Sequence, residues 1–155
     1  MMTEDIVDKD VLNNLRSLHT GAIDARNGYR EALEDAEGKG MTPLFRDMVA
    51  LHEGNASELA GELAKAGEKP DEKGSFMSVV HETIMDVRSL FNGLDESVLP
   101  GLIDGEQRNV AKYDAALNDA KPGEISSLLM AQRRKLVQKI AEMEAQKAAR
   151  DRTSS

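Results

Sequence analysis

The chain has 155 residues, enough for one domain with its own core, and no cysteine, which excludes disulfides, thiolate metal ligands and cysteine catalysis. Its formal net charge of −8 argues against a general nucleic-acid binder, because neutralising phosphates requires clustered Lys and Arg. The start, MMTEDIVDKD, does not have the pattern of a secretory leader, and no apolar run approaches the ~18 residues of a membrane span. We therefore expect a cytoplasmic protein that binds neither nucleic acid nor membrane.

The apolar residues, mostly Leu, Met, Val, Ile and Ala, recur at spacings of three, four and seven, which is typical of amphipathic helices. Turn-forming stretches rich in Gly and Pro separate these periodic segments. In the second segment we expect Thr42 to be the N-cap and Pro43 the first helical residue. Five helices are predicted, at about 10–36, 43–66, 76–92, 97–119 and 124–150, followed by a tail at 151–155 that we expect to fray.

The helix lengths favour one packing arrangement. Four of the helices are long, about 20 residues or more, and the one at 76–92 is shorter. Short turns predict two antiparallel hairpins, which the shorter helix would join as a crossover. The pattern predicts a single all-α domain over residues 1–155 with the fold of a ferritin-like four-helix bundle. The alternative is a five-helix up-down array.

Small residues form a row along each of the first two helices. The rows contain Gly21 and Gly28 on the first helix and Gly54 and Gly61 on the second. A glycine inside a helix costs about 1 kcal/mol relative to alanine, and close backbone packing would offset that cost. We therefore predict close helix packing at these four glycines. The alternative is that the rows lie on the surface, and the crossover helix or a second subunit could also cover them.

The order of several stretches resembles a bacterial family of uncharacterised ferritin-like proteins, a domain-of-unknown-function family related to stress-associated bundle proteins. The stretches are VLNNL, IDARNGYREALEDAE, LFRDMVALHEGNASEL, GSFMSVVHETIMDVRSL and GEQRNVAKYDAAL. They cover most of residues 10–120, and the last helix matches more loosely. The resemblance implies a ferritin-like bundle whose members mostly have no assigned activity.

Ferritin-like bundles with a di-metal site use a Glu from each of two helices and a Glu-x-x-His motif from each of the other two, suited to iron or manganese. On the fourth helix, Glu106 lies on the apolar side, as a ligand should. The matching level of the first helix has Arg26, and the second helix has His52 and Asn55. Glu-x-x-His occurs nowhere in the chain. We therefore expect no metal, no other cofactor and no catalytic residues.

These inward polar residues predict a buried polar layer in place of a metal centre. We expect Arg26 and Glu106 to form a charge-assisted pair, with His52, Asn55 and Gln132 completing the hydrogen bonds. The alternative for Arg26 is that its stem lies on the core edge while its guanidinium reaches water.

We favour a non-catalytic structural or interaction protein, or the stress-related protein that the resemblance implies, over an enzyme. The last helix has leucines and a methionine at sevens, Leu129, Leu136 and Met143, with Leu128 and Val137 on adjacent sides. This pattern predicts an exposed apolar side that binds a partner helix, with a homodimer as the expected assembly. The alternative for these residues is that they cover the crossover helix. The alternative is an iron- or manganese-handling oxidase with a non-standard site that includes Glu106 and His52.

Overall fold

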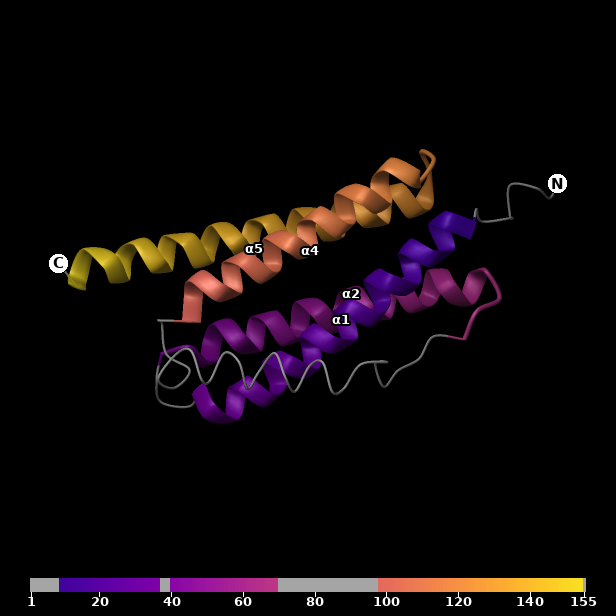
Figure 1. Ribbon diagram of the computed structural model, residues 1–155. Coiled ribbons are helices and arrows are strands. Elements are labelled where there is room, and N and C mark those ends of the chain that lie inside the picture. The colour runs from indigo at the N-terminus through magenta and orange to yellow at the C-terminus, as the bar shows by residue number, and fades with distance from the viewer. Residues whose placement is uncertain (1–8, 37–39, 70–97, 155) are drawn as a thin grey trace.

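The computed structural model describes residues 9–36, 40–69 and 98–154, and over these ranges the chain is all-α (Figure 1). No strand occurs in them. The helix expected at 76–92 lies outside the described residues. The four described helices are α1 (Lys9–Ala36), α2 (Thr42–Lys65), α4 (Leu99–Asp119) and α5 (Glu124–Ser154).

The four helices form two antiparallel hairpins that pack against each other. One hairpin consists of α1 and α2, and the other of α4 and α5; between the hairpins α1 contacts α4 and α2 contacts α5. Figure 1 shows that α2 and α4 run in the same direction, so that α2 ends and α4 begins at opposite ends of the bundle. Each helix is therefore antiparallel to both of its neighbours. Within the described ranges no helix combines the length and the apolar character needed to cross a bilayer.

The helix ends follow local chemistry. Pro43 and Pro100 lie in the first turns of α2 and α4, where no intrahelical N–H donor is needed. The N-cap of α2 is Met41 rather than the expected Thr42, and no side chain caps this end. Gly67 ends α2 with a φ of 85°, and the N–H of Glu68 donates to the carbonyl of Leu63. That pattern is a Schellman motif, which requires the left-handed conformation that glycine adopts without strain.

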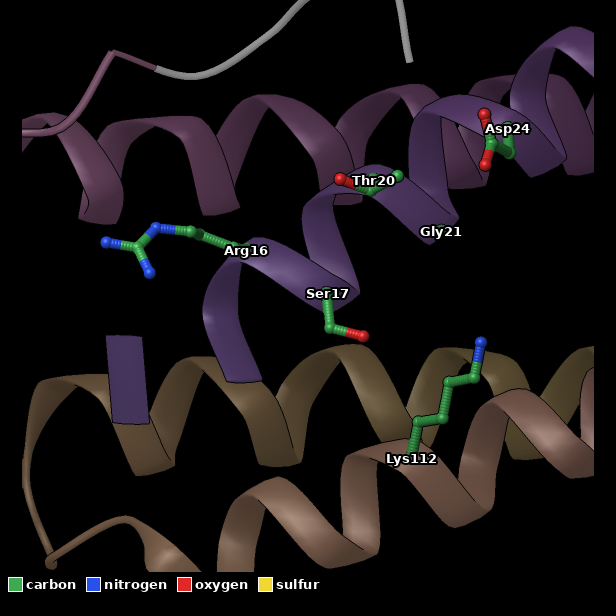
Figure 2. A pocket seen from close by; sticks show the side chains of 6 residues that line it. All are labelled: Arg16, Ser17, Thr20, Gly21, Asp24 and Lys112. Carbon is green, nitrogen blue, oxygen red and sulfur yellow. The ribbon is translucent and has the colours of Figure 1, made fainter. Parts of the chain in front are cut away.

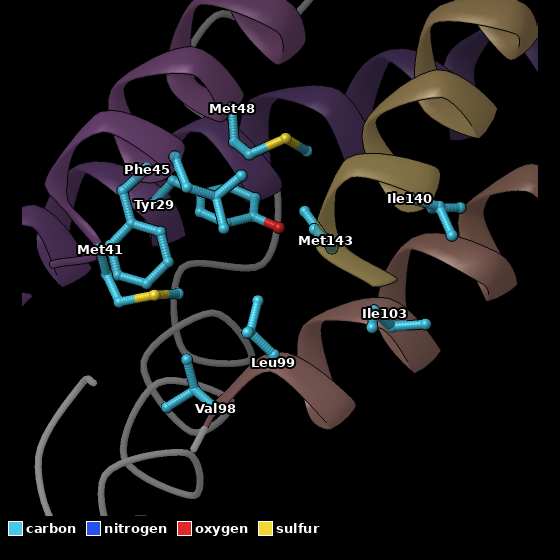
Figure 3. Close-up of a cluster of buried hydrophobic side chains, with 10 residues drawn as sticks. Tyr29, Met41, Phe45, Met48, Val98, Leu99, Ile103, Ile140 and Met143 are labelled. Atoms are coloured by element: carbon cyan, nitrogen blue, oxygen red, sulfur yellow. The ribbon is translucent and has the colours of Figure 1, made fainter. Parts of the chain in front are cut away.

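The core consists of two apolar clusters at different levels of the bundle. One cluster gathers around Phe45, Met48 and Met143, and Figure 3 shows that its side chains come from all four helices. The other gathers around Leu15, Leu59, Leu63 and other leucines. Complete burial of one such side chain stabilises the fold by roughly 1.5–3 kcal/mol. Along α2 and α4 a set of buried polar residues separates the two clusters.

The prediction of close packing at the glycines is wrong for three of the four. Gly54 and Gly61 are exposed and Gly21 is partly exposed, and a Cβ atom added at any of them would meet nothing within 4 Å. The row on α2 lies on the side of the helix opposite its apolar stripe and therefore faces away from α1. Gly28 is half-buried. The small residues buried between the two helices are Ala22 and Ala56.

The prediction of an exposed apolar side on α5 is wrong for the repeat of leucines and methionine, whereas Val137 on the adjacent side is 42% exposed. Leu129, Leu136 and Met143 are at most 1% exposed and belong to the core of the chain itself. A repeat of seven brings these residues to one face, but that face packs onto the other hairpin. The helix also continues to Ser154, past the point where we expected it to fray.

Candidate functional site

The buried polar residues centre on the carboxylate of Glu106. Tyr29 on α1 donates its hydroxyl to Glu106 Oε2 at 2.8 Å. His52 Nε2, on α2, lies 3.0 Å from the same oxygen. Asn109, one turn after Glu106 on α4, donates to Oε1 at 3.4 Å. Three helices therefore contribute to the hydrogen bonds of one carboxylate.

The two shorter hydrogen bonds to this carboxylate come from buried side chains, Tyr29 and His52. His52 is 1% exposed and Glu106 is 5% exposed. The ring of Tyr29 stacks on the ring of His52, with 5.8 Å between centroids and 14° between planes. The stacking fixes both donors beside the oxygen that they share. For His52 to donate to this oxygen, its Nε2 must carry a proton.

The electrostatics of the group favour an ionised carboxylate. Burial raises the pKa of Glu106, but the hydrogen bond and charge of His52, with further bonds from Tyr29 and Asn109, outweigh burial and lower it below its usual value. Burial, then the charge of Glu106 and the hydrogen bond to it, raise the pKa of Tyr29 well above its ordinary value. Tyr29 therefore remains a protonated donor at neutral pH. This arrangement stabilises one buried negative charge.

A second hydrogen-bonded group lies next to the first and involves α5. Tyr113 on α4 donates to Gln132 Oε1 at 2.6 Å. Gln132 in turn donates to the backbone carbonyl of Asn55 at 3.3 Å and to Glu58 at 3.1 Å. Burial, then the charges of Glu106 and Glu58, raise the pKa of Tyr113. We call the two groups together the polar layer, which comprises Tyr29, His52, Asn55, Glu58, Glu106, Asn109, Tyr113 and Gln132.

Of the residues expected to meet in this layer, Glu106, His52, Asn55 and Gln132 are all buried, and Arg26 behaves differently. Arg26 is half-buried, and its guanidinium donates to the side chain of Asn27 at 3.1 and 3.2 Å. The expected pair with Glu106 is not formed, because Tyr29, His52 and Asn109 occupy that carboxylate. Asn55 contributes its backbone carbonyl, while its side-chain amide has no hydrogen-bond partner among the described residues.

Four members of the polar layer, Tyr29, Glu58, Asn109 and Tyr113, were not among the residues expected to meet there. Tyr29 and Tyr113 lie in apolar stripes, and the sequence pattern treats them as core residues. A buried tyrosine nonetheless has a hydroxyl that needs a hydrogen-bond partner. Because both tyrosines lie near the height of Glu106 along the bundle, their hydroxyls could have been predicted to join the polar layer. Asn109 is three residues from Glu106 on the same helix face, a spacing at which side chains meet.

The donor set does not fit a di-metal centre. Such a centre needs several carboxylates and two imidazoles at one level. Among residues 9–36, 40–69 and 98–154, no three His, Asp or Glu side chains are grouped so that they could hold a metal ion. Glu106 is the carboxylate at the centre, and three donors already point at it. The arrangement is suited to fixing a charge in place.

A separate depression lies between α1 and α4, with a volume of about 370 Å³. Arg16, Ser17, Thr20, Gly21, Asp24 and Lys112 line it (Figure 2). Figure 2 shows Ser17 and Lys112 pointing into the space between the helices, whereas Arg16 points away. Arg16 instead bonds to Glu68 at 2.6 Å. The polar groups therefore do not converge on one point as they do around Glu106.

The chain matches the model of a known protein family. The model of the family described as a domain of unknown function, DUF2383, matches residues 10–119, a range that extends from the start of α1 to the end of α4. Among curated proteins, no match is found.

Proposed function

The chain belongs to the DUF2383 family, and we propose that it is a non-catalytic ferritin-like bundle acting as a structural or interaction protein. In this proposal the polar layer occupies the level at which metal-bearing ferritin-like bundles hold their ions. The protein works in the cytoplasm as a dimer, and its role is connected with stress.

The arrangement of the helices supports a ferritin-like bundle. The α1–α2 and α4–α5 hairpins pack so that neighbouring helices are antiparallel, while α2 and α4 run in the same direction (Figure 1). A bundle of two hairpins with one long crossover has this order. The family match covers both sides of the crossover.

The observation that carries the proposal is the set of partners around Glu106. Tyr29 and His52 both direct donors at Oε2, at 2.8 and 3.0 Å. To bind a metal ion through its Nε2, His52 would have to give up that proton and its bond to Glu106. The bonds join α1, α2 and α4 at one level, and a buried polar group of this kind is suited to fixing helix register.

Metal content and metal-dependent stability test this proposal. The full chain is purified from cells grown with added iron and manganese, and both metals are quantified. We expect far less than one ion per chain, and we expect Fe(II) or Mn(II) to leave the melting temperature unchanged. Near-stoichiometric metal that is lost in the variants Glu106→Gln and His52→Gln would instead establish a metal-handling protein.

A double-mutant cycle tests the structural role of the layer. We expect Glu106→Gln and His52→Gln each to lower the free energy of unfolding, and the double variant to lose less than the sum of the two. The matched control is Glu53→Gln, which changes an exposed carboxylate on α2. Additive losses at positions 52 and 106 would refute a coupled layer.

A further inference from the structure

The outward side of α5 has an unusual composition. Met130 and Val137 are 48% and 42% exposed, and they are the exposed large hydrophobic residues of the described part of the chain. They lie seven residues apart, which places them on one side of the helix. Spacings of four and three extend this line along α5. The outer seam, as we call it, consists of Met130, Arg134, Val137, Ala141, Glu144 and Ala148, all exposed.

The charges of the outer seam take no part in holding the bundle together. Arg133 and Lys139, on neighbouring sides of α5, pair with Asp114 on α4 at 2.6 Å and with Asp47 on α2 at 3.3 Å. By contrast, Arg134 and Glu144 have no ion pair and no hydrogen bond within the described part of the chain. Arg133 and Lys139 thus dock α5 onto the bundle, while Arg134 and Glu144 are exposed to solvent.

We propose that the outer seam binds the same seam of a second copy of this chain, with the two α5 helices antiparallel. The two-fold axis lies at the level of Lys139. Arg134 then faces Glu144 of the partner subunit, and Glu144 faces the partner's Arg134. Val137 faces Ala141 of the partner subunit, and Met130 faces Ala148 of the partner subunit. This inference deepens the proposed interaction role by naming its partner.

Two properties of the outer seam select this partner and this direction. The spacing of four and three is that of a heptad core, along which two helices can pack side by side. Here every large side chain faces an alanine and every charge faces its opposite, so one surface is complementary to itself. Closed two-fold assembly requires self-complementarity of this kind. In a parallel pairing Arg134 would face its own copy and the like charges would repel.

The size of the contact indicates a weak dimer. The outer seam runs about 27 Å along α5 from Met130 to Ala148, at a rise of about 1.5 Å per residue. It presents two large apolar side chains per copy, fewer than a standard protein interface. We therefore expect a dissociation constant weaker than about 1 µM.

Sedimentation equilibrium of the full chain and its charge variants tests the pairing. We expect the wild type to dimerise at high concentration, and Arg134→Glu and Glu144→Arg each to weaken self-association at least about tenfold, because each places like charges opposite one another twice. An equimolar mixture of the two variants, and the double variant Arg134→Glu/Glu144→Arg, should recover association. Arg46→Glu, the same charge change at an exposed position on α2, serves as the control.

A wild type that stays monomeric at the highest concentration would overturn the proposal. So would an Arg134→Glu variant that associates as strongly as wild type, or a mixture that fails to recover. Since these substitutions lie on the surface of α5, circular dichroism should show unchanged helix content. The metal and stability measurements on the polar layer do not involve these residues. A result that refutes the dimer would therefore not refute the proposed role of the polar layer.

Discussion

Two acid–base contacts of α2 with other helices have almost the same length and very different surroundings. His52 lies 3.0 Å from Glu106, with side chains 1% and 7% exposed. Arg30 on α1 lies 3.1 Å from Glu53, with side chains 50% and 52% exposed. The first contact has two further donors, Tyr29 and Asn109, around its carboxylate. Distance alone therefore says little about the energy of such a contact, because solvent decides how strongly the charges interact.

Removal of the buried carboxylate should have the largest effect. We expect Glu106→Ala to lower the free energy of unfolding by about 3–5 kcal/mol, because His52 and Tyr29 are left buried without their acceptor. Urea unfolding followed by circular dichroism measures this loss. The matched substitution Glu53→Ala should change stability by less than about 1 kcal/mol. Equal effects of the two substitutions would show that burial does not separate the contacts.

Removal of a single donor should have a smaller effect. We expect Tyr29→Phe to cost about 1.5–3 kcal/mol, because it removes a hydrogen bond to a charged acceptor. Tyr113→Phe is the matched control, since it removes a bond of 2.6 Å to the neutral amide of Gln132. Its cost should be about 0.5–1.5 kcal/mol. If Tyr113→Phe costs more than Tyr29→Phe, the charge on Glu106 does not strengthen the layer.

Acid should weaken the buried contact without removing any atoms. The pKa of Glu106 is lowered in the folded chain, since the bonds from His52, Tyr29 and Asn109 outweigh burial. Its contribution to stability is therefore complete above the unfolded pKa, near 4.5, and is lost as the pH falls through the lower folded pKa. Unfolding free energies measured below pH 5 should fall more steeply for wild type than for Glu106→Gln. Parallel curves would contradict this assignment.

The smallest effect is expected at the exposed pair. A double-mutant cycle on Arg30→Ala and Glu53→Ala should give a coupling energy of about 0.2–1 kcal/mol. Because both groups lie in solvent, 1 M salt should reduce this coupling towards zero. A coupling that persists at high salt would mean that the pair is not screened and that the contrast with Glu106 is weaker than its burial implies.

Sequence periodicity predicted where helices occur and which side of each faces inward. The observed bounds lie within two residues of those expected, apart from the end of α5. Glu106 and Gln132 lie on the inward sides assigned to them, and both are buried. The partners of these residues were harder to predict. Arg26 lies near the same side of α1 as Tyr29, and a helical wheel cannot tell which of the two reaches Glu106.

The same limit explains the errors at the glycines and on α5. A row of small residues and a repeat of leucines each mark a face of a helix, but neither states what covers that face. Gly54 and Gly61 lie on an outward face, and Leu136 on an inward one. Of the two exposed apolar residues of α5, Val137 was expected on the side next to the leucine repeat, and Met130 was missed.

The amino-acid sequence by itself determined an all-α chain, the approximate ends of its helices and the presence of a carboxylate among inward apolar residues. These features depend on spacing within one helix, where 3.6 residues per turn fixes which side chains share a face. Only the tertiary structure decided that Tyr29 and His52, rather than Arg26, hold Glu106, and that the leucines of α5 are internal. Those outcomes depend on how helices are rotated and offset against each other, and side chains far apart in the chain determine both together.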